Sequence, residues 1–272
     1  MGTSGTVNVN EHELYYEVHG EGEPLILIMG IGYDSSLWTL YQVPALARRF
    51  QVVIFDNRDA GRSAQASEAY TIADMSDDVA GLMDALGIDR AHLVGLSMGA
   101  LIAEEFALRY PARLYRLVLS GPDIAPGRHA FHPIAVWNWV KTNDKAGDTF
   151  AVQQFASLFS AAFLRNSAAV QQTVDFLSSN PHPVTAQAYA RQAHAYLQYD
   201  PADRLAGIKA PTLVITGEQD LLTPPWIARE VAESIPGARL EIMKGDGASH
   251  VVPLERPDEF NALVSDFLIS AS

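Results

Sequence analysis

The 272-residue sequence predicts an α/β protein: a doubly wound, mostly parallel sheet with an inserted helical cap. Three observations support this prediction. Short, uninterrupted apolar runs are typical of strands that are covered on both faces. Helical patterns alternate with these runs, as they do in parallel sheets with right-handed crossovers. From about residue 123 to residue 208 the alternation stops, and only helical patterns continue.

The strands are expected in the following order. Two segments flank a short polar link and predict an opening hairpin, Thr6–Val9 and Leu14–Val18. Six apolar runs follow, most of them ending at a glycine or an aspartate: Leu25–Met29, Val52–Phe55, His92–Val94, Leu117–Leu119, Leu213–Ile215 and Leu240–Met243. Helical patterns lie between them, beginning near Ser35 and covering Ile72–Leu86, Met98–Arg109, Pro224–Ser234 and Pro257–Leu268.

The region from 123 to 208 predicts four amphipathic helices, Phe131–Asn143, Thr149–Arg165, Ala168–Ser179 and Thr185–Gln198. We interpret it as a cap over one end of the sheet. The expected organisation is a core formed by 1–122 and 209–272, with a helical cap formed by 123–208. The alternative is an ordinary run of core helices. The region is rich in aromatic residues that must pack in either case, so only some of them can face a ligand.

Composition and charge exclude several classes of function. Lysine plus arginine is 19 and aspartate plus glutamate is 32, so the formal charge is −13. Such an acidic surface repels phosphate backbones and argues against nucleic acid as a partner. No run approaches the roughly 18 apolar residues of a membrane helix, so no membrane association is expected. The sequence contains no cysteine, which removes disulfides and thiolate metal sites and fits a cytoplasmic location.

A nucleophilic serine is predicted at position 97. Gly95-Leu96-Ser97-Met98-Gly99 directly follows a predicted strand and directly precedes a predicted helix, which is the context of a nucleophile elbow. In such a turn the serine adopts a strained backbone conformation, and small flanking residues let the strand and helix approach. The alternative is a tight turn in which Ser97 only caps the helix, but capping does not require glycine on both sides.

With these features the sequence resembles the α/β-hydrolase family, and specifically its esterase and lactonase-like branch with a helical cap. The resemblance covers nearly the whole chain. It implies that a histidine after the last strand is the general base, and His250 in Gly247-Ala248-Ser249-His250 occupies that place. The alternative is that His250 is a histidine of a surface loop without a catalytic role.

The resemblance also implies an acid that orients the histidine. Asp220 closes the loop after the penultimate strand, and the order Ser97, Asp220, His250 is that of the family. Two rivals are Glu218, nearer the strand, and Asp123, which follows the preceding core strand, where some relatives carry their acid. We favour a turn or helix-capping role for Asp123.

Two backbone amides are expected to bind the oxyanion of the tetrahedral intermediate. One is the amide of Met98, directly after the nucleophile. By resemblance the other belongs to Ile31, in the loop Met29-Gly30-Ile31-Gly32. Many relatives have a histidine where Met29 stands, and that histidine often anchors the loop through hydrogen bonds. Methionine cannot do so, although a backbone donor remains. The alternative for Gly30 and Gly32 is an ordinary flexible turn.

The segment Asp56–Ser63 also resembles a family segment, which usually has glycine where Asp59 stands. We interpret it as a tight structural loop with self-contained ion pairs. A substrate role for Arg58 or Arg62 is the less favoured alternative.

The motifs predict a serine hydrolase of the carboxylic-ester type that cleaves a small, mainly apolar ester or lactone through an acyl-enzyme. Serine at position 97 argues against the dehalogenases and epoxide hydrolases of this fold, which carry aspartate there. No metal-binding cluster, phosphate loop or dinucleotide fingerprint is present, so no metal or cofactor is expected.

Several alternatives stay open. They are an acyl-homoserine lactone or enol-lactone lactonase, a cofactor-free perhydrolase or haloperoxidase, a C–C bond hydrolase, and a ligand receptor on a hydrolase scaffold. The sequence does not indicate an oligomeric state.

Overall fold

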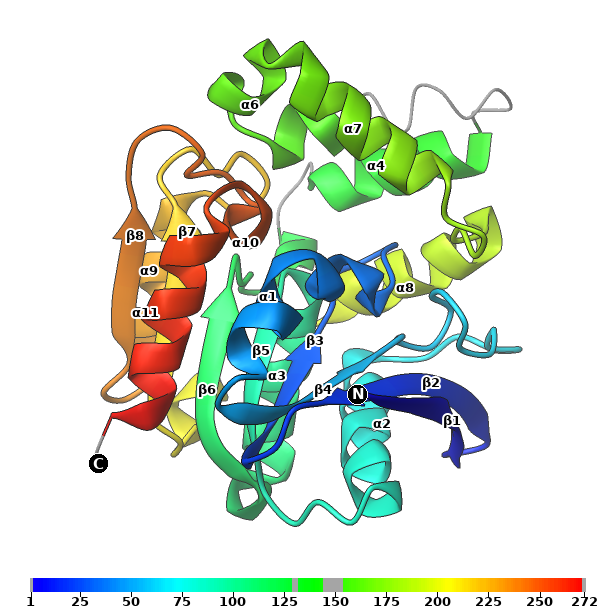
Figure 1. The fold of residues 1–272 in the computed structure, drawn as a ribbon, viewed down its shortest axis with the longest axis vertical. Coiled ribbons are helices and arrows are strands. Elements are labelled where there is room, and N and C mark those ends of the chain that lie inside the picture. Colours follow the sequence, from blue (N-terminus) through cyan, green and yellow to red (C-terminus); the bar gives the residue numbers. More distant parts are fainter. Residues whose placement is uncertain (1, 129–131, 144–153, 271–272) are drawn as a thin grey trace.

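The computed structural model describes residues 2–128, 132–143 and 154–270, and its centre is an eight-stranded sheet (Figure 1). The strand order is β1-β2-β4-β3-β5-β6-β7-β8. The strands are β1 (Thr3–Val9), β2 (His12–His19), β3 (Glu23–Ile28), β4 (Phe50–Phe55), β5 (Ala91–Leu96), β6 (Leu114–Ser120), β7 (Thr212–Gly217) and β8 (Arg239–Met243). β2 pairs antiparallel with β1 and β4, and all other pairs are parallel. The predicted α/β architecture is confirmed.

Helices cover both faces of the sheet, which explains the uninterrupted apolar runs. In β3, Leu25 and Leu27 pack in one hydrophobic cluster with α1 (Trp38–Leu46) and α11 (Pro257–Ile269). Ile26 and Ile28 point to the other face and pack in the cluster that includes α2, α3 and α9. These three helices are α2 (Ile72–Ala85), α3 (Met98–Arg109) and α9 (Pro225–Ser234). Alternate side chains of one strand are therefore buried against different helices.

The region 123–208, here called the cap segment, contains helices and connecting loops but no strand in the part that the structure describes. Its helices are α4 (Pro133–Asn143), a helical stretch at 154–158, α6 (Ala161–Arg165), α7 (Ser167–Ser178) and α8 (Ala186–Gln198). In Figure 1, α4, α6 and α7 lie beyond the carboxyl ends of the parallel strands, while α8 lies lower, close to the core. Trp137 of α4 and Tyr196 of α8 belong to the same hydrophobic cluster as α2 and α3. The exact division into core and cap stays a prediction.

The expected single helix Thr149–Arg165 is wrong in its described part. Residues 144–153 lie outside the described ranges, and the helix at 154–158 ends before α6 begins. Ser160 separates the two, with an extended backbone and an Oγ that accepts a hydrogen bond from the Phe163 amide. Its own amide and hydroxyl donate to the carboxylate of Glu255, at 2.9 and 2.6 Å. These hydrogen bonds to a residue 95 positions away interrupt the helix that the local pattern predicts.

The helix α10 (Val252–Glu255) carries that carboxylate and lies directly after the predicted histidine loop. It therefore connects the cap segment to the loop that holds His250. No helix in the described ranges is long and apolar enough to span a membrane.

Candidate active site

Ser97 occupies a sharp turn between β5 and α3, with φ 56° and ψ −121°. A non-glycine residue in this region of backbone space is strained. The glycines on both sides are required by space, because a Cβ on Gly95 would lie 2.2 Å from the Gly99 carbonyl oxygen. A Cβ on Gly99 would lie 2.1 Å from the carbonyl oxygen of Ile28. The Ser97 side chain makes no capping bond to α3, so the helix-cap alternative does not describe it.

His250 and Asp220 come together at the carboxyl edge of the sheet. His250 follows β8 and Asp220 follows β7, and Nδ1 of the imidazole lies 2.8 Å from Oδ2 of the carboxylate. Both side chains are buried, so His250 is not a surface histidine. Because the carboxylate only accepts, this contact assigns the Nδ1 proton and leaves Nε2 as the basic nitrogen.

The Asp220 carboxylate is itself held in place by three further hydrogen bonds. Oδ1 accepts from the amides of Leu222 and Thr223, at 2.9 and 2.8 Å. Oδ2 accepts from the Thr223 hydroxyl at 3.0 Å. The acid therefore has little freedom to rotate away from the imidazole.

Ser97 and His250 line one cavity but do not form a hydrogen bond with each other in this structure. Within the described part of the chain, the buried His250 Nε2 has no hydrogen-bond partner. The imidazole packs against Gly121 at the end of β6, where a Cβ would lie 2.9 Å from its Cε1. The two side chains thus meet at the wall of one cavity without a direct hydrogen bond.

The shared cavity is small and mainly apolar, with a volume of about 50 Å³. Trp137, Leu158 and Phe159 of the cap segment form part of its wall, and Ser97 and His250 supply its reactive groups. Other aromatic residues of the cap segment pack away from it. Trp139 is exposed on α4, whereas Tyr196 is buried in the core.

A second, larger and more polar cavity of about 310 Å³ adjoins the first. The two share Tyr33, Leu37 and Leu177 as lining residues. The Tyr33 hydroxyl donates to Gln154 Oε1 of the cap segment at 3.1 Å, and burial raises the pKa of this phenol, so it stays a hydrogen-bond donor. These three side chains form the boundary between an apolar chamber beside Ser97 and a polar one beyond it.

The two predicted oxyanion donors come from the loop after β3 and from the start of α3. Among the described residues, the amides of Ile31 and Met98 have no hydrogen-bond acceptor, and Ile31 lines the cavity beside Ser97. Met98 is the first residue of α3, so its amide lacks an intrahelical partner. Both amides are available to an anion that forms next to Ser97.

Two residues that the sequence reasoning missed hold this loop. Asn57 Nδ2 donates to the carbonyl of Met29 at 3.0 Å, and Gln192 Oε1 accepts from the amide of Gly32 at 2.8 Å. They hold the loop on both sides of Ile31, where the apolar side chain of Met29 cannot form hydrogen bonds. The Gln192 contact spans 160 positions and leaves no local signal in the sequence.

The two alternative candidates for the acid, Glu218 and Asp123, have hydrogen-bond partners other than His250. Glu218 is exposed, and its carboxylate accepts from the Gly245 amide at 2.6 Å. Asp123 is fully buried, and its Oδ2 accepts from Tyr196 and faces His132 Nε2, each at 2.8 Å. Asp123 Oδ1 also accepts from the Ile124 amide, which is the turn contact that we expected, but this contact is only one of those that Asp123 makes. Asp123 mainly joins the end of β6 to the cap segment.

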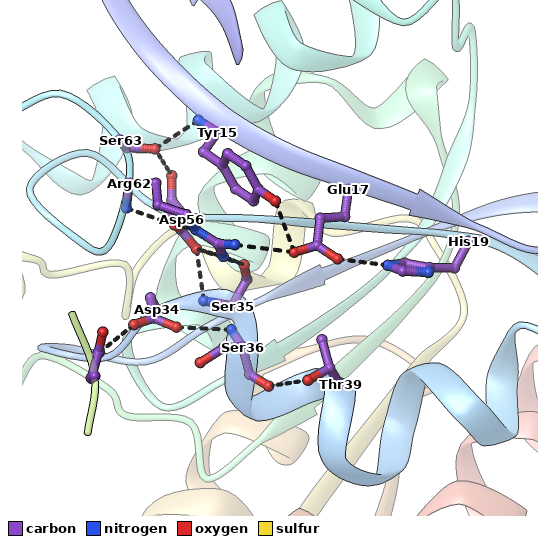
Figure 2. Close-up of polar contacts among 11 residues, drawn as sticks. Tyr15, Glu17, His19, Asp34, Ser35, Ser36, Thr39, Asp56, Arg62 and Ser63 are labelled. Atoms are coloured by element: carbon purple, nitrogen blue, oxygen red, sulfur yellow. Dashed lines mark hydrogen bonds and ion pairs between the residues drawn. The ribbon is translucent and has the colours of Figure 1, made fainter. Parts of the chain in front are cut away.

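The prediction of self-contained ion pairs in the loop after β4 is correct for Arg62 and wrong for its neighbours. Figure 2 shows Arg62 bound to Asp56 of the same loop, with a further bond to Glu17 of β2. Arg58 instead pairs with Asp78 of α2, at 2.6 and 2.7 Å. Asp59, which has a left-handed φ of 69°, pairs with Arg191 of α8. The loop thus connects three parts of the molecule.

Comparison with known proteins places the chain in one family. The model of the "alpha/beta hydrolase fold" family matches residues 23–257. The "Putative carbamate hydrolase RutD" of Caulobacter sp. (strain K31) is 34% identical over 97% of each chain. The structure of an enol-lactonase from Burkholderia xenovorans LB400 superposes with a TM-score of 0.85, at 33% identity over 98% of this chain and 100% of that one.

A further relative carries a different kind of name. The "Putative non-heme bromoperoxidase BpoC" of Mycobacterium tuberculosis (strain CDC 1551 / Oshkosh) is 31% identical over 94% of this chain and 98% of its own. Relatives of similar distance are thus named for different reactions, whereas the family model and the solved structures agree on the fold. The protein described here belongs to the alpha/beta hydrolase fold family.

Proposed function

We propose that this protein is a serine hydrolase that cleaves a small carboxylic ester or lactone through an acyl-enzyme. One observation carries the proposal: Ser97, on a strained elbow, and His250, oriented by Asp220 at 2.8 Å, line the same small apolar cavity. A serine hydroxyl needs such a base to become a nucleophile near neutral pH.

The reaction would proceed in two halves. Ser97 Oγ attacks the carbonyl carbon, its proton passes to His250 Nε2, and the carbonyl electron pair moves onto oxygen. The amides of Ile31 and Met98 bind this oxyanion. As the intermediate collapses, the bond to the leaving alkoxide breaks and His250 returns the proton to it. Water then attacks the acyl-enzyme by the same route and regenerates the Ser97 hydroxyl.

The two adjoining cavities indicate how a substrate would be oriented. The apolar chamber beside Ser97 suits a short acyl group, because it holds only about 50 Å³. The polar chamber of about 310 Å³ beyond Tyr33 suits the alcohol portion. In a lactone the two portions belong to one ring, so breaking the ester bond opens the ring. The alcohol end stays attached to the acyl group, and the ring-opened chain remains on Ser97 until water releases it as a hydroxy acid. The similarity to an enol-lactonase favours this kind of substrate.

Carbamate hydrolysis is a second candidate function. It is favoured by the similarity to the putative carbamate hydrolase, at 34% identity over nearly the full chain. The same nucleophile, base and oxyanion donors would act on a carbamate carbonyl, and a small chamber suits a small carbamate. A panel of short esters, lactones and carbamates, together with halide plus peroxide, separates these reactions and the peroxidase alternative.

Ser97→Ala is the direct test of the proposal. Pure mutant protein should hydrolyse p-nitrophenyl acetate and p-nitrophenyl butyrate at least 10³-fold more slowly than the wild type, since the nucleophile is lost. An unchanged thermal midpoint would show that the variant is folded. Wild-type rates in the folded variant would refute the mechanism.

A further inference from the structure

We infer that Gln192, on helix α8 of the cap segment, is a positioning residue. It holds the loop formed by residues 29–32, here called the oxyanion loop, in the conformation that the reaction needs. The inference rests on the proposed function. It assigns to the cap segment a part in the chemical step, in addition to forming a wall of the cavity.

The side chain of Gln192 is fully buried, and both ends of its amide are used. Oε1 accepts from the Gly32 amide at 2.8 Å, and Nε2 donates to the Arg58 carbonyl at 3.0 Å. A primary amide is the neutral group that can accept and donate in this way. Because the two contacts use different atoms, the side chain cannot rotate without losing both hydrogen bonds in a buried place.

The contact to Gly32 fixes the peptide unit that directly follows Ile31. At the other side of Ile31, Asn57 Nδ2 holds the carbonyl of Met29 at 3.0 Å. The loop is therefore held at both ends, with the candidate oxyanion donor between them. The Met29 side chain is apolar, so in the described part of the chain these two amide side chains supply the side-chain hydrogen bonds to residues 29–32.

The same helix also shapes the loop by packing. Gly32 has φ +78°, and a Cβ placed on it would lie 2.9 Å from Cε2 of Tyr189, which precedes Gln192 by one helical turn. Tyr189 is fully buried against the loop. Only a glycine fits this backbone and this distance. One turn of α8 thus contacts Gly32 through both a ring and an amide.

Helix α8 is itself fixed to the core, so it can act as a rigid support. Arg191, the neighbour of Gln192, makes two hydrogen bonds to the buried Asp59, at 2.6 and 2.7 Å. Thr185 caps the start of the helix by accepting from the Ala188 amide. A donor held by a rigid support needs no reorganisation when charge develops, which is the condition for strong transition-state stabilisation.

Gln192→Met tests the inference, because methionine has a similar length and no strong hydrogen-bonding group. We expect kcat on p-nitrophenyl acetate to fall about 10- to 100-fold while KM changes less than about twofold, because the loss affects the transition state. Gln187→Met, at an exposed position of the same helix, is the matched control and should retain wild-type kcat.

A pair of ligands separates positioning from a general structural role. A short alkyl trifluoromethyl ketone adds to a catalytic serine and places an oxyanion in the hole, whereas the matched unfluorinated ketone does so far less. In Gln192→Met the dissociation constant of the fluorinated ketone should rise by the same factor as kcat/KM falls. That of the unfluorinated ketone should stay constant. Equal weakening of both ligands, or an unchanged kcat, would overturn the inference.

If Gln192→Met does not fold, hydrogen exchange of the backbone amides in the wild-type enzyme still tests the inference. The Gly32 amide should be protected in the free enzyme, whereas the Ile31 amide should become protected only when the fluorinated ketone binds. Rapid exchange at Gly32 in the free enzyme would contradict the inference. The proposed function fails separately, if folded Ser97→Ala retains turnover or if the ketone does not compete with substrate.

Discussion

At the residue scale, the position of Asp220 shows how one carboxylate can fix the orientation and tautomer of a histidine that lies 30 positions away in the sequence. Its four hydrogen-bonding contacts leave one orientation, in which Oδ2 faces His250 Nδ1. The imidazole is thereby held at the wall of the cavity that Ser97 also lines, with Nε2 free of any partner among the described residues. Asp123 has an equally buried carboxylate, but it faces Tyr196 and His132. Burial alone therefore does not distinguish the two carboxylates, and the proposal for Asp220 rests on its partner, His250.

Asp220→Asn should lower kcat by about 10⁴, because the amide favours the wrong imidazole tautomer. Asp123→Asn is the matched control, and we expect it to lower stability while retaining most of the turnover. Steady-state kinetics on a short p-nitrophenyl ester, with a thermal unfolding scan of each variant, measures both effects. If Asp123→Asn abolished turnover and Asp220→Asn did not, the acid would be wrongly assigned.

Glu104 is a residue whose effect on stability depends on pH. It is fully buried in α3, and neither carboxyl oxygen has a hydrogen-bond partner in the part of the chain that the structure describes. Burial, reinforced by the charges of Asp123 and Glu105, raises the pKa of this carboxyl well above its ordinary value. The folded protein thus keeps a proton that the unfolded chain releases. The resulting stability is complete below the unfolded-state pKa and is lost as pH rises toward the folded-state pKa.

Glu104→Gln should therefore raise the thermal midpoint, and the gain should grow between pH 5.5 and pH 8. The neutral amide does not ionise, so it removes a penalty that reaches about 1.4 kcal/mol per pH unit. Glu105→Gln is the contrasting variant, because Glu105 is paired with Arg204 at 2.8 Å and its loss should destabilise. A gain at Glu104 that does not vary with pH would contradict this explanation.

At the element scale, α8 connects the cap segment to the loops that surround the site. Its periodicity predicts a helix over Thr185–Gln198, and the structure places α8 at Ala186–Gln198, with Thr185 as the N-cap and not the first helical residue. Its contacts to Asp59 and Gly32 could not be predicted, because neither partner lies nearby in the sequence. The same is true of Ser160, whose contact to Glu255 ends a helix that the local pattern would continue.

Arg191→Met should lower the free energy of unfolding by about 3 kcal/mol, because it leaves the buried Asp59 carboxylate without its cation. Arg128→Met removes the partner of an exposed pair with Asp200 and should change stability by less than about 1 kcal/mol. Chemical denaturation of both variants at neutral pH gives the two values. Equal effects would show that the Asp59 pair does not fix α8.

At the scale of the whole molecule, the sequence predicts the framework better than the details of the site. The central strands β3 to β7 can be predicted because each contains an apolar run that is buried between two helical layers. That Ser97, Asp220 and His250 lie near one another can be predicted because each follows a strand, and strand ends meet at one edge of a parallel sheet. Their catalytic roles stay a prediction. The roles of Asn57 and Gln192 could not be predicted, because no sequence motif marks them. Each holds the loop after β3 through a contact to a residue far away in the sequence.

Labelling with a fluorophosphonate, followed by peptide mass spectrometry, tests the central proposal most directly. The reagent should inactivate the wild-type enzyme at one label per chain, with the label on the peptide that contains Ser97. Folded Ser97→Ala should take up no label at the site. Stoichiometric inactivation through a different residue, or full turnover in an enzyme that carries the label on Ser97, would contradict the account.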